Sequence, residues 1–136
     1  MIRVVMFSVV YLLCFNVFGQ NSVNNEDVMD SIDRGVIIYE DFCMNCHLVD
    51  GEGVENVIPP LALSDFLMKN REESLKVVKF GQSGKIVVNG KTYNGTMTAM
   101  GLTGQEIADV MNYITNSFGN SNAIKFTEQE VLKIEK

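Results

Sequence analysis

Apolar residues recur at three- and four-residue steps in two distant stretches, which predicts two amphipathic helices. The first helix is expected to begin with Ser31 as its cap, and its apolar face comprises Ile32, Gly35, Val36, Tyr39 and Phe42. The second follows a capping-box pattern at Thr103 and Glu106, and its apolar face comprises Ile107, Val110, Met111 and Ile114. Gly35 either lets a crossing helix approach closely or is tolerated at a cost of about 1 kcal/mol relative to alanine. We expect the two helices to pack together at Gly35 and Tyr39.

A different pattern lies between these helices. β-branched and aromatic residues flank Asn89-Gly90, which predicts a hairpin over residues 85–93 with a two-residue type I′ turn. Short helices are expected from Ser64 to Met68 and from Glu72 to a stop at Gly81. A two-stranded hairpin alone is marginally stable, so we expect it to lie against the helices.

Both ends of the chain differ from its centre. An apolar run of about a dozen residues follows Arg3 and ends near Gly19, which is typical of a secretory signal peptide. The run is shorter than the about 20 apolar residues of a membrane span, although an uncleaved anchor is the alternative. Cys14 follows a leucine, whereas a lipoprotein signal has a small residue there. We therefore predict a signal peptide at 1–19, a flexible lead-in at 20–30, a folded domain at 31–118 and a loosely packed or partner-binding polar tail at 119–136, with Thr127 capping a final turn.

Cys43, Cys46 and His47 form a C-x-x-C-H motif, the pattern of covalent c-type haem attachment. Two thiols at this spacing can add to the two vinyl groups of haem, and the imidazole that follows can reach the iron. A structural disulfide or a redox dithiol would leave His47 without a role. Structural zinc requires four nitrogen or sulfur ligands, and no further histidine or cysteine exists outside the leader. The motif therefore predicts haem c.

Since His47 is the only histidine, a second imidazole cannot be the other axial ligand of the iron. Methionine suits electron transfer, because Met/His ligation raises the reduction potential. Four methionines outside the leader have another explanation in the core, in the motif or before the fold: Met29, Met44, Met68 and Met111. The residues alone leave Met97 and Met100 as candidates, both in a predicted loop between the hairpin and the last helix.

Further short motifs flank the C-x-x-C-H sequence, namely Arg34-Gly35, Tyr39, Asp50-Gly51, Pro59-Pro60-Leu61, Tyr93-Asn94-Gly95-Thr96-Met97 and the helix at 107–114. Together they resemble the class I monohaem cytochromes c over about residues 31–118. The resemblance implies an all-α cytochrome c fold. Its N- and C-terminal helices would pack crosswise around a covalent haem, with one short β-hairpin before the distal methionine loop.

The resemblance also implies a set of residues that hold haem c and its iron: thioether bonds from Cys43 and Cys46, the proximal ligand His47 and the distal ligand Met97. Met100 is the second choice for the distal ligand, because Thr98 stands where the family commonly has proline. The carbonyl of Pro59, with Pro60 as second choice, would hold the free N–H of the proximal imidazole.

What the resemblance implies about function is a periplasmic one-electron carrier rather than an enzyme, since two filled axial positions leave no site for substrate. Its partners would be redox proteins that donate and accept the electron. Membrane contact is expected only through an uncleaved leader or a membrane-bound partner, in the periplasm or at the outer face of the bacterial inner membrane. The alternative is a cytochrome c domain that serves as a subunit of a respiratory oxidase, dehydrogenase or nitrite reductase complex.

Charge adds one further expectation. The net charge of −6 and pI near 4.7 argue against a nucleic-acid partner, which would favour a basic patch. Acidic residues predominate from Glu26 to Asp65, whereas basic residues predominate from Phe66 to Thr96. The basic segment is either a set of solvated helix faces or a surface that orients a redox partner.

Overall fold

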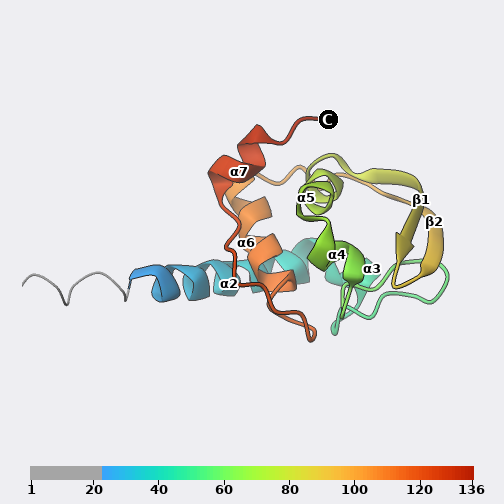
Figure 1. Ribbon diagram of the computed structural model, residues 1–136, viewed down its shortest axis with the longest axis horizontal. Helices are drawn as coiled ribbons and strands as arrows, with labels where there is room; N and C mark the ends of the chain where they lie inside the picture. Colours follow the sequence, from blue (N-terminus) through green and yellow to red (C-terminus); the bar gives the residue numbers. More distant parts are fainter. Residues whose placement is uncertain (1–22) are drawn as a thin grey trace, which may run out of the picture.

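The computed structural model describes residues 23–136 (Figure 1), so the predicted signal peptide and Cys14 lie outside the described residues. The elements are α2 (Val23–Phe42), α3 (Met44–His47), α4 (Asp65–Lys69), α5 (Arg71–Phe80), β1 (Gln82–Val88), β2 (Lys91–Met97), α6 (Gly104–Ile114) and α7 (Glu128–Lys133). The fold is thus a set of helices with one small two-stranded sheet. No helix within residues 23–136 is both long enough and apolar enough to cross a membrane.

Helix α2 begins at Val23, well before the predicted start at Ser31. Residues 23–30, expected to be a flexible lead-in, are therefore the first turns of this helix. Ser31 is not its cap but a fully buried residue inside it, and its hydroxyl donates a hydrogen bond to Asp109 Oδ1 at 2.6 Å. The Ser31 hydroxyl was a poor guide to where the helix begins, because its partner lies on a distant helix and not on the first turn of its own.

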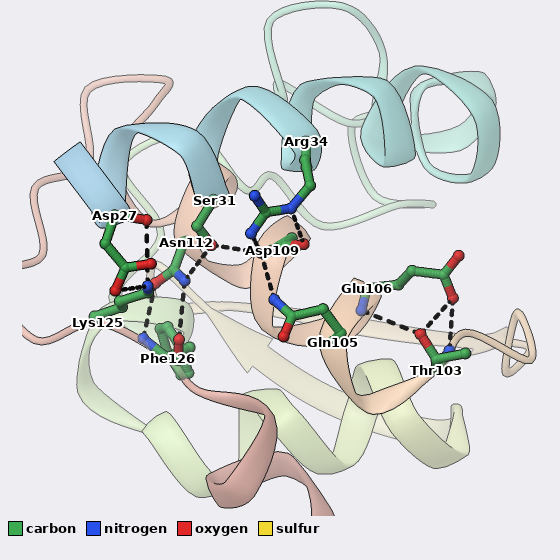
Figure 2. Close-up of polar contacts among 10 residues, drawn as sticks. All are labelled: Asp27, Ser31, Arg34, Thr103, Gln105, Glu106, Asp109, Asn112, Lys125 and Phe126. Carbon is green, nitrogen blue, oxygen red and sulfur yellow. Dashed lines mark hydrogen bonds and ion pairs between the residues drawn. The ribbon is translucent and has the colours of Figure 1, made fainter.

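Helix α2 packs against α6, and the contact combines a close backbone approach with a buried polar network (Figure 2). A Cβ atom at Gly35 would overlap the backbone carbonyl of Asp109, which supports the close-approach interpretation of this glycine. The side chain of Asp109 is buried, yet it accepts hydrogen bonds from Arg34 Nε at 2.7 Å and from Gln105 Nε2 at 2.9 Å. These donors offset the cost of removing a carboxylate from water.

The hairpin is confirmed, and it is longer than predicted. Strands β1 and β2 pair antiparallel from Gln82 opposite Met97 to Val88 opposite Lys91. Asn89 and Gly90 have positive φ angles of 51° and 75°, as a type I′ turn requires. Met97 is therefore the last residue of a strand rather than a loop residue, and only Met100 lies in the irregular segment before α6.

Several local caps fix the remaining elements. Ser64 caps α4 by accepting a hydrogen bond from the Leu67 N–H, and the predicted capping box of Thr103 and Glu106 begins α6. The hairpin turn is tied to the start of α4, because Asn89 and Asp65 exchange backbone-to-side-chain hydrogen bonds of 2.9 and 2.7 Å. These contacts hold the hairpin against the helical part of the molecule.

The C-terminal tail packs closely against α5 and α6, which corrects the expectation of loose packing. Phe126 and Val131 are buried in the main core, and Thr127 caps α7 as predicted. Asn112 of α6 donates a hydrogen bond of 3.0 Å to the Phe126 carbonyl and accepts one of 2.7 Å from its N–H (Figure 2). The tail is thus part of the folded unit.

Two basic residues of α5 hold the tail. Arg71 forms a bidentate pair with Glu130, with N–O distances of 2.6 and 2.7 Å, and its guanidinium lies 3.5 Å from the ring centroid of Phe126. It also donates to the carbonyls of Ile124 and Lys125. Near the other end of α5, Lys79 Nζ donates to two backbone carbonyls at the end of α7, those of Val131 and Ile134.

We expect Arg71→Lys to lower the free energy of unfolding by about 1–3 kcal/mol, because lysine cannot reproduce the planar fork or its stacking on Phe126. Urea denaturation measures this change. Lys76→Gln is the matched control on the same helix, since Lys76 pairs only with the exposed carboxylates of Glu72 and Glu73. An equal decrease in the free energy of unfolding in both variants would show that the contact of Arg71 with the tail stabilises the protein no more than an exposed ion pair does.

Candidate functional site

The C-x-x-C-H motif forms a single helical turn directly after α2. The backbone N–H groups of Cys46 and His47 both donate to the carbonyl of Cys43, at 3.1 and 2.9 Å, so the three side chains belong to one compact turn. The turn is anchored from α2 by Tyr39, whose buried hydroxyl donates a 2.6 Å hydrogen bond to the carbonyl of Leu48. Leu48 ends the turn with a positive φ of 65°.

All three motif side chains line one cavity. Its walls come from the segment 57–61, helices α4 and α5, the hairpin, the segment leading to α6, and α6 itself. The lining is largely apolar and includes Ile58, Leu61, Phe66, Leu67, Val77, Val78, Ile86, Val88, Leu102, Val110 and Ile114. Such a lining suits a flat apolar macrocycle such as haem.

The surroundings of His47 favour the neutral imidazole, which is the form that binds a metal ion. It is only 9% exposed, and its Nδ1 lies 3.2 Å from the Pro59 carbonyl oxygen, the contact that the resemblance implied. Burial lowers the pKa of the imidazole, and the hydrogen bond to Pro59 opposes part of this shift. A neutral ring that donates from Nδ1 leaves the lone pair of Nε2 free to bind iron. Pro60 lines the same cavity but makes no such contact with His47.

The two cysteines do not have the environment of a reactive dithiol. Both are free thiols, and Cys46 is exposed. Burial, followed by the proximity of Cys46, raises the pKa of the Cys43 thiol to about 11. Thiolate is the form that attacks disulfides, so a raised pKa disfavours a redox dithiol. Within residues 23–136, moreover, no three His, Cys, Asp or Glu side chains are grouped to hold a metal ion by themselves.

The cavity brings together two methionines and excludes the others that the structure describes. Met97 and Met100 both line it, whereas Met111 is fully buried in the main core and Met29 is exposed. Met97 has the more rigid backbone, because it is paired in the sheet and packed against the end of α5. A Cβ atom at Gly81 would lie only 2.6 Å from the Met97 carbonyl oxygen.

Among the polar residues of the cavity, Ser74 and Gln82 entered no sequence-based prediction, and Tyr93 was named only as part of the hairpin and the family motif. Tyr93 could have been found, because it lies opposite Ile86 in the hairpin and alternation places both on one face. Ser74 had a weaker signal: Val77 and Val78 follow it at helical spacing. The site as a whole fits covalent haem, since two thiols, a buried neutral imidazole and two thioethers converge on one apolar cavity.

Comparisons with known proteins agree with this chemistry. The cytochrome c family model matches residues 32–118. Cytochrome c-552 of Thermus thermophilus is 37% identical over 101 residues, which cover 68% of this chain and 77% of that protein.

Two dehydrogenase subunits are also similar. The cytochrome c subunit of the alcohol dehydrogenase (quinone) of Gluconacetobacter polyoxogenes is 32% identical over 106 residues, or 74% of this chain and 22% of the subunit. The gluconate 2-dehydrogenase cytochrome c subunit of Pantoea cypripedii is 28% identical over 117 residues, or 79% of this chain and 25% of the subunit. The chain belongs to the cytochrome c family, whose members transfer electrons with a covalently bound haem c and its iron.

Proposed function

We propose that the protein is a periplasmic one-electron carrier whose haem iron is ligated by His47 and Met97. The observation that supports this most directly is that both side chains line the same cavity as Cys43 and Cys46. With two protein ligands on the iron, no coordination site remains for oxygen or substrate. A carrier therefore fits this ligand set better than an enzyme.

The residues of the chain have separate tasks in this proposal. Cys43 and Cys46 attach the haem by thioether bonds, and the Pro59 carbonyl fixes the orientation of the His47 ring. Strand pairing fixes the backbone of Met97. When bound, haem supplies an iron that alternates between the ferrous and ferric states. Ligands that stay in place in both states keep the structural reorganisation small, and an apolar cavity favours the less charged ferrous form.

In this proposal the haem-binding part of the chain is residues 31–118, where α2 and α6 cross at Gly35, and the first turns of α2 and the C-terminal tail extend the folded unit on either side. Residues 1–19 would be the signal peptide. Export suits this site, because covalent attachment of haem c takes place outside the bacterial cytoplasm. The protein would then act in the periplasm or at the outer face of the inner membrane, where contact with the membrane comes only through an uncleaved leader or a membrane-bound partner.

The redox partners are proposed to be other proteins, and the charges bear on how they would dock. Most basic residues of the segment 66–96 already have partners: Arg71 with Glu130, Lys76 with Glu72 and Glu73, Lys79 with α7 carbonyls, and Lys91 with Glu55. Within this segment, Lys69 and Lys85 have neither an ion pair nor a side-chain hydrogen bond to any of residues 23–136, and Lys79 has hydrogen bonds but no ion pair. This supports solvated and paired helix faces more than a basic docking surface.

A second candidate is a cytochrome c domain within a dehydrogenase complex. It is favoured by the similarity to the alcohol dehydrogenase and gluconate 2-dehydrogenase subunits, although the chain spans only 22% and 25% of their lengths. Purification of the native protein from its own cells distinguishes the two. A carrier is expected alone, whereas a subunit is expected with its catalytic chain.

The proposal is tested on the wild-type protein. We expect haem to stay attached to the denatured polypeptide, the optical spectrum to titrate as a one-electron couple, and the reduced spectrum to be unchanged by carbon monoxide. Cys43→Ser combined with Cys46→Ser is the control for attachment and should release haem on denaturation. A reduced protein that binds carbon monoxide readily would have an open coordination site, contrary to the proposal.

A further inference from the structure

We propose that the hydroxyl of Ser74 donates a hydrogen bond to the haem centre and thereby raises its reduction potential. Ser74 lies on α5, is only 3% exposed and lines the cavity. Its hydroxyl oxygen is buried and has no hydrogen-bond partner among residues 23–136. The inference rests on haem c in this cavity. If the acceptor is the sulfur of the axial methionine, it also rests on the proposed methionine ligation.

A lone buried hydroxyl is unusual, and the other buried hydroxyls of this protein show the usual solutions. Thr115, the residue directly after α6, donates to the Met111 carbonyl one turn earlier, at 2.6 Å, and Ser64 accepts a hydrogen bond from the Leu67 N–H. Ser74 follows neither pattern. Only its backbone N–H bonds to the preceding turn, at 2.8 Å from the Asn70 carbonyl oxygen. A buried donor left unsatisfied costs about 1–3 kcal/mol, so an acceptor inside the cavity would be stabilising.

The surroundings of Ser74 indicate where that acceptor comes from. Val77 and Val78 follow Ser74 at helical spacing and line the same cavity with apolar side chains. The ligand itself is therefore the natural source. A haem centre carries two kinds of acceptor, the oxygens of its propionates and the thioether sulfur of an axial methionine, which is a weaker acceptor. Both have lone pairs that a serine hydroxyl can satisfy.

The sign of the effect is the same for both acceptors. A donating hydroxyl directs the positive end of its dipole toward the haem centre. This favours the ferrous form, which has one electron more than the ferric form. The interaction is stronger in a cavity that excludes water than at an exposed surface. Removal of the hydroxyl should therefore lower the reduction potential.

The test compares holoprotein variants by potentiometric titration. We expect Ser74→Ala to lower the equilibrium constant for one-electron reduction by up to about tenfold, which corresponds to ~59 mV. Ser74→Thr keeps a hydroxyl and should restore most of the potential. Thr115→Val is the matched control, because it removes a buried hydroxyl that already has a partner and does not line the cavity. It should change stability while leaving the potential as in the wild type.

Two further measurements identify the acceptor. If it is a propionate, Ser74→Ala changes the pH dependence of the potential. If it is the thioether, the pH dependence is unchanged, but the iron–sulfur charge-transfer absorption and the NMR shift of the ligand methyl group move. A potential equal to that of the wild type in Ser74→Ala overturns the inference, as does an equal shift in Thr115→Val. The proposed function is tested separately, by the spectrum of the wild-type protein with and without carbon monoxide. A negative result for Ser74 therefore leaves the proposed function standing.

Discussion

Replacement of Met97 by alanine is expected to abolish low-spin His/Met ligation of the haem iron, whereas Met100→Ala should preserve it. Both side chains line the cavity, but only Met97 has its backbone fixed by strand pairing with Gln82 and by contact with Gly81. Met100 lies beside Gly101 in an irregular segment. A ligand on a rigid element loses less conformational entropy when it binds the metal, which favours Met97.

The loss of Met97 should have two measurable consequences. The potential should fall on the order of 0.1–0.3 V, a fraction of the ~0.8 V range over which axial ligands tune haem. The reduced protein should also bind carbon monoxide, because a coordination site becomes open. Redox-titrated spectra of the wild type and both variants measure these effects. Loss of the low-spin spectrum in Met100→Ala alone would transfer the ligand role to Met100.

Features whose cause is local could be predicted from the sequence. The capping box of Thr103 and Glu106, the type I′ turn at Asn89-Gly90 and the cap at Thr127 all depend on residues within a few positions of one another. The C-x-x-C-H turn is local as well, since its backbone hydrogen bonds stay within the motif and its immediate neighbours. Such short patterns can be interpreted from the sequence because all the residues that form the interaction lie within the pattern.

Features that depend on distant partners were missed. Ser31 resembled a helix cap, but its hydroxyl bonds to Asp109, 78 positions away. The tail was expected to pack loosely because it is polar, yet Glu130 pairs with Arg71 across 59 positions. Ser74 entered no prediction, because its helical spacing to Val77 and Val78 does not by itself show that this face of α5 lines a cavity. Periodicity finds the face of an element, whereas only the folded chain shows what that face contacts.

Gly35→Ala is expected to lower the free energy of unfolding by about 2 kcal/mol. Alanine is the better helix former by about 1 kcal/mol, which taken alone would stabilise α2. Its Cβ, however, would overlap the Asp109 backbone carbonyl and lie 2.7 Å from Cβ of Tyr113. Neither atom lies at the free end of a flexible side chain, so α2 and α6 must separate. Overpacking of this kind costs about 1–3 kcal/mol, and we expect the upper end here.

Gly104→Ala is the matched control for the close approach at Gly35. Gly104 is also helical, but an added Cβ would meet only side chains, with Glu128 Cγ at 3.1 Å and Leu132 Cδ2 at 3.4 Å. Leu132 is exposed and Glu128 is half-buried, and both flexible side chains can shift, so Gly104→Ala should leave the stability measured by urea denaturation nearly unchanged. The shift of α2 in Gly35→Ala should also reach the haem site, because Cys43 follows this helix directly. If the Gly35→Ala protein were as stable as the wild type, α2 and α6 could accommodate a Cβ atom at this position. The close approach would then not require glycine.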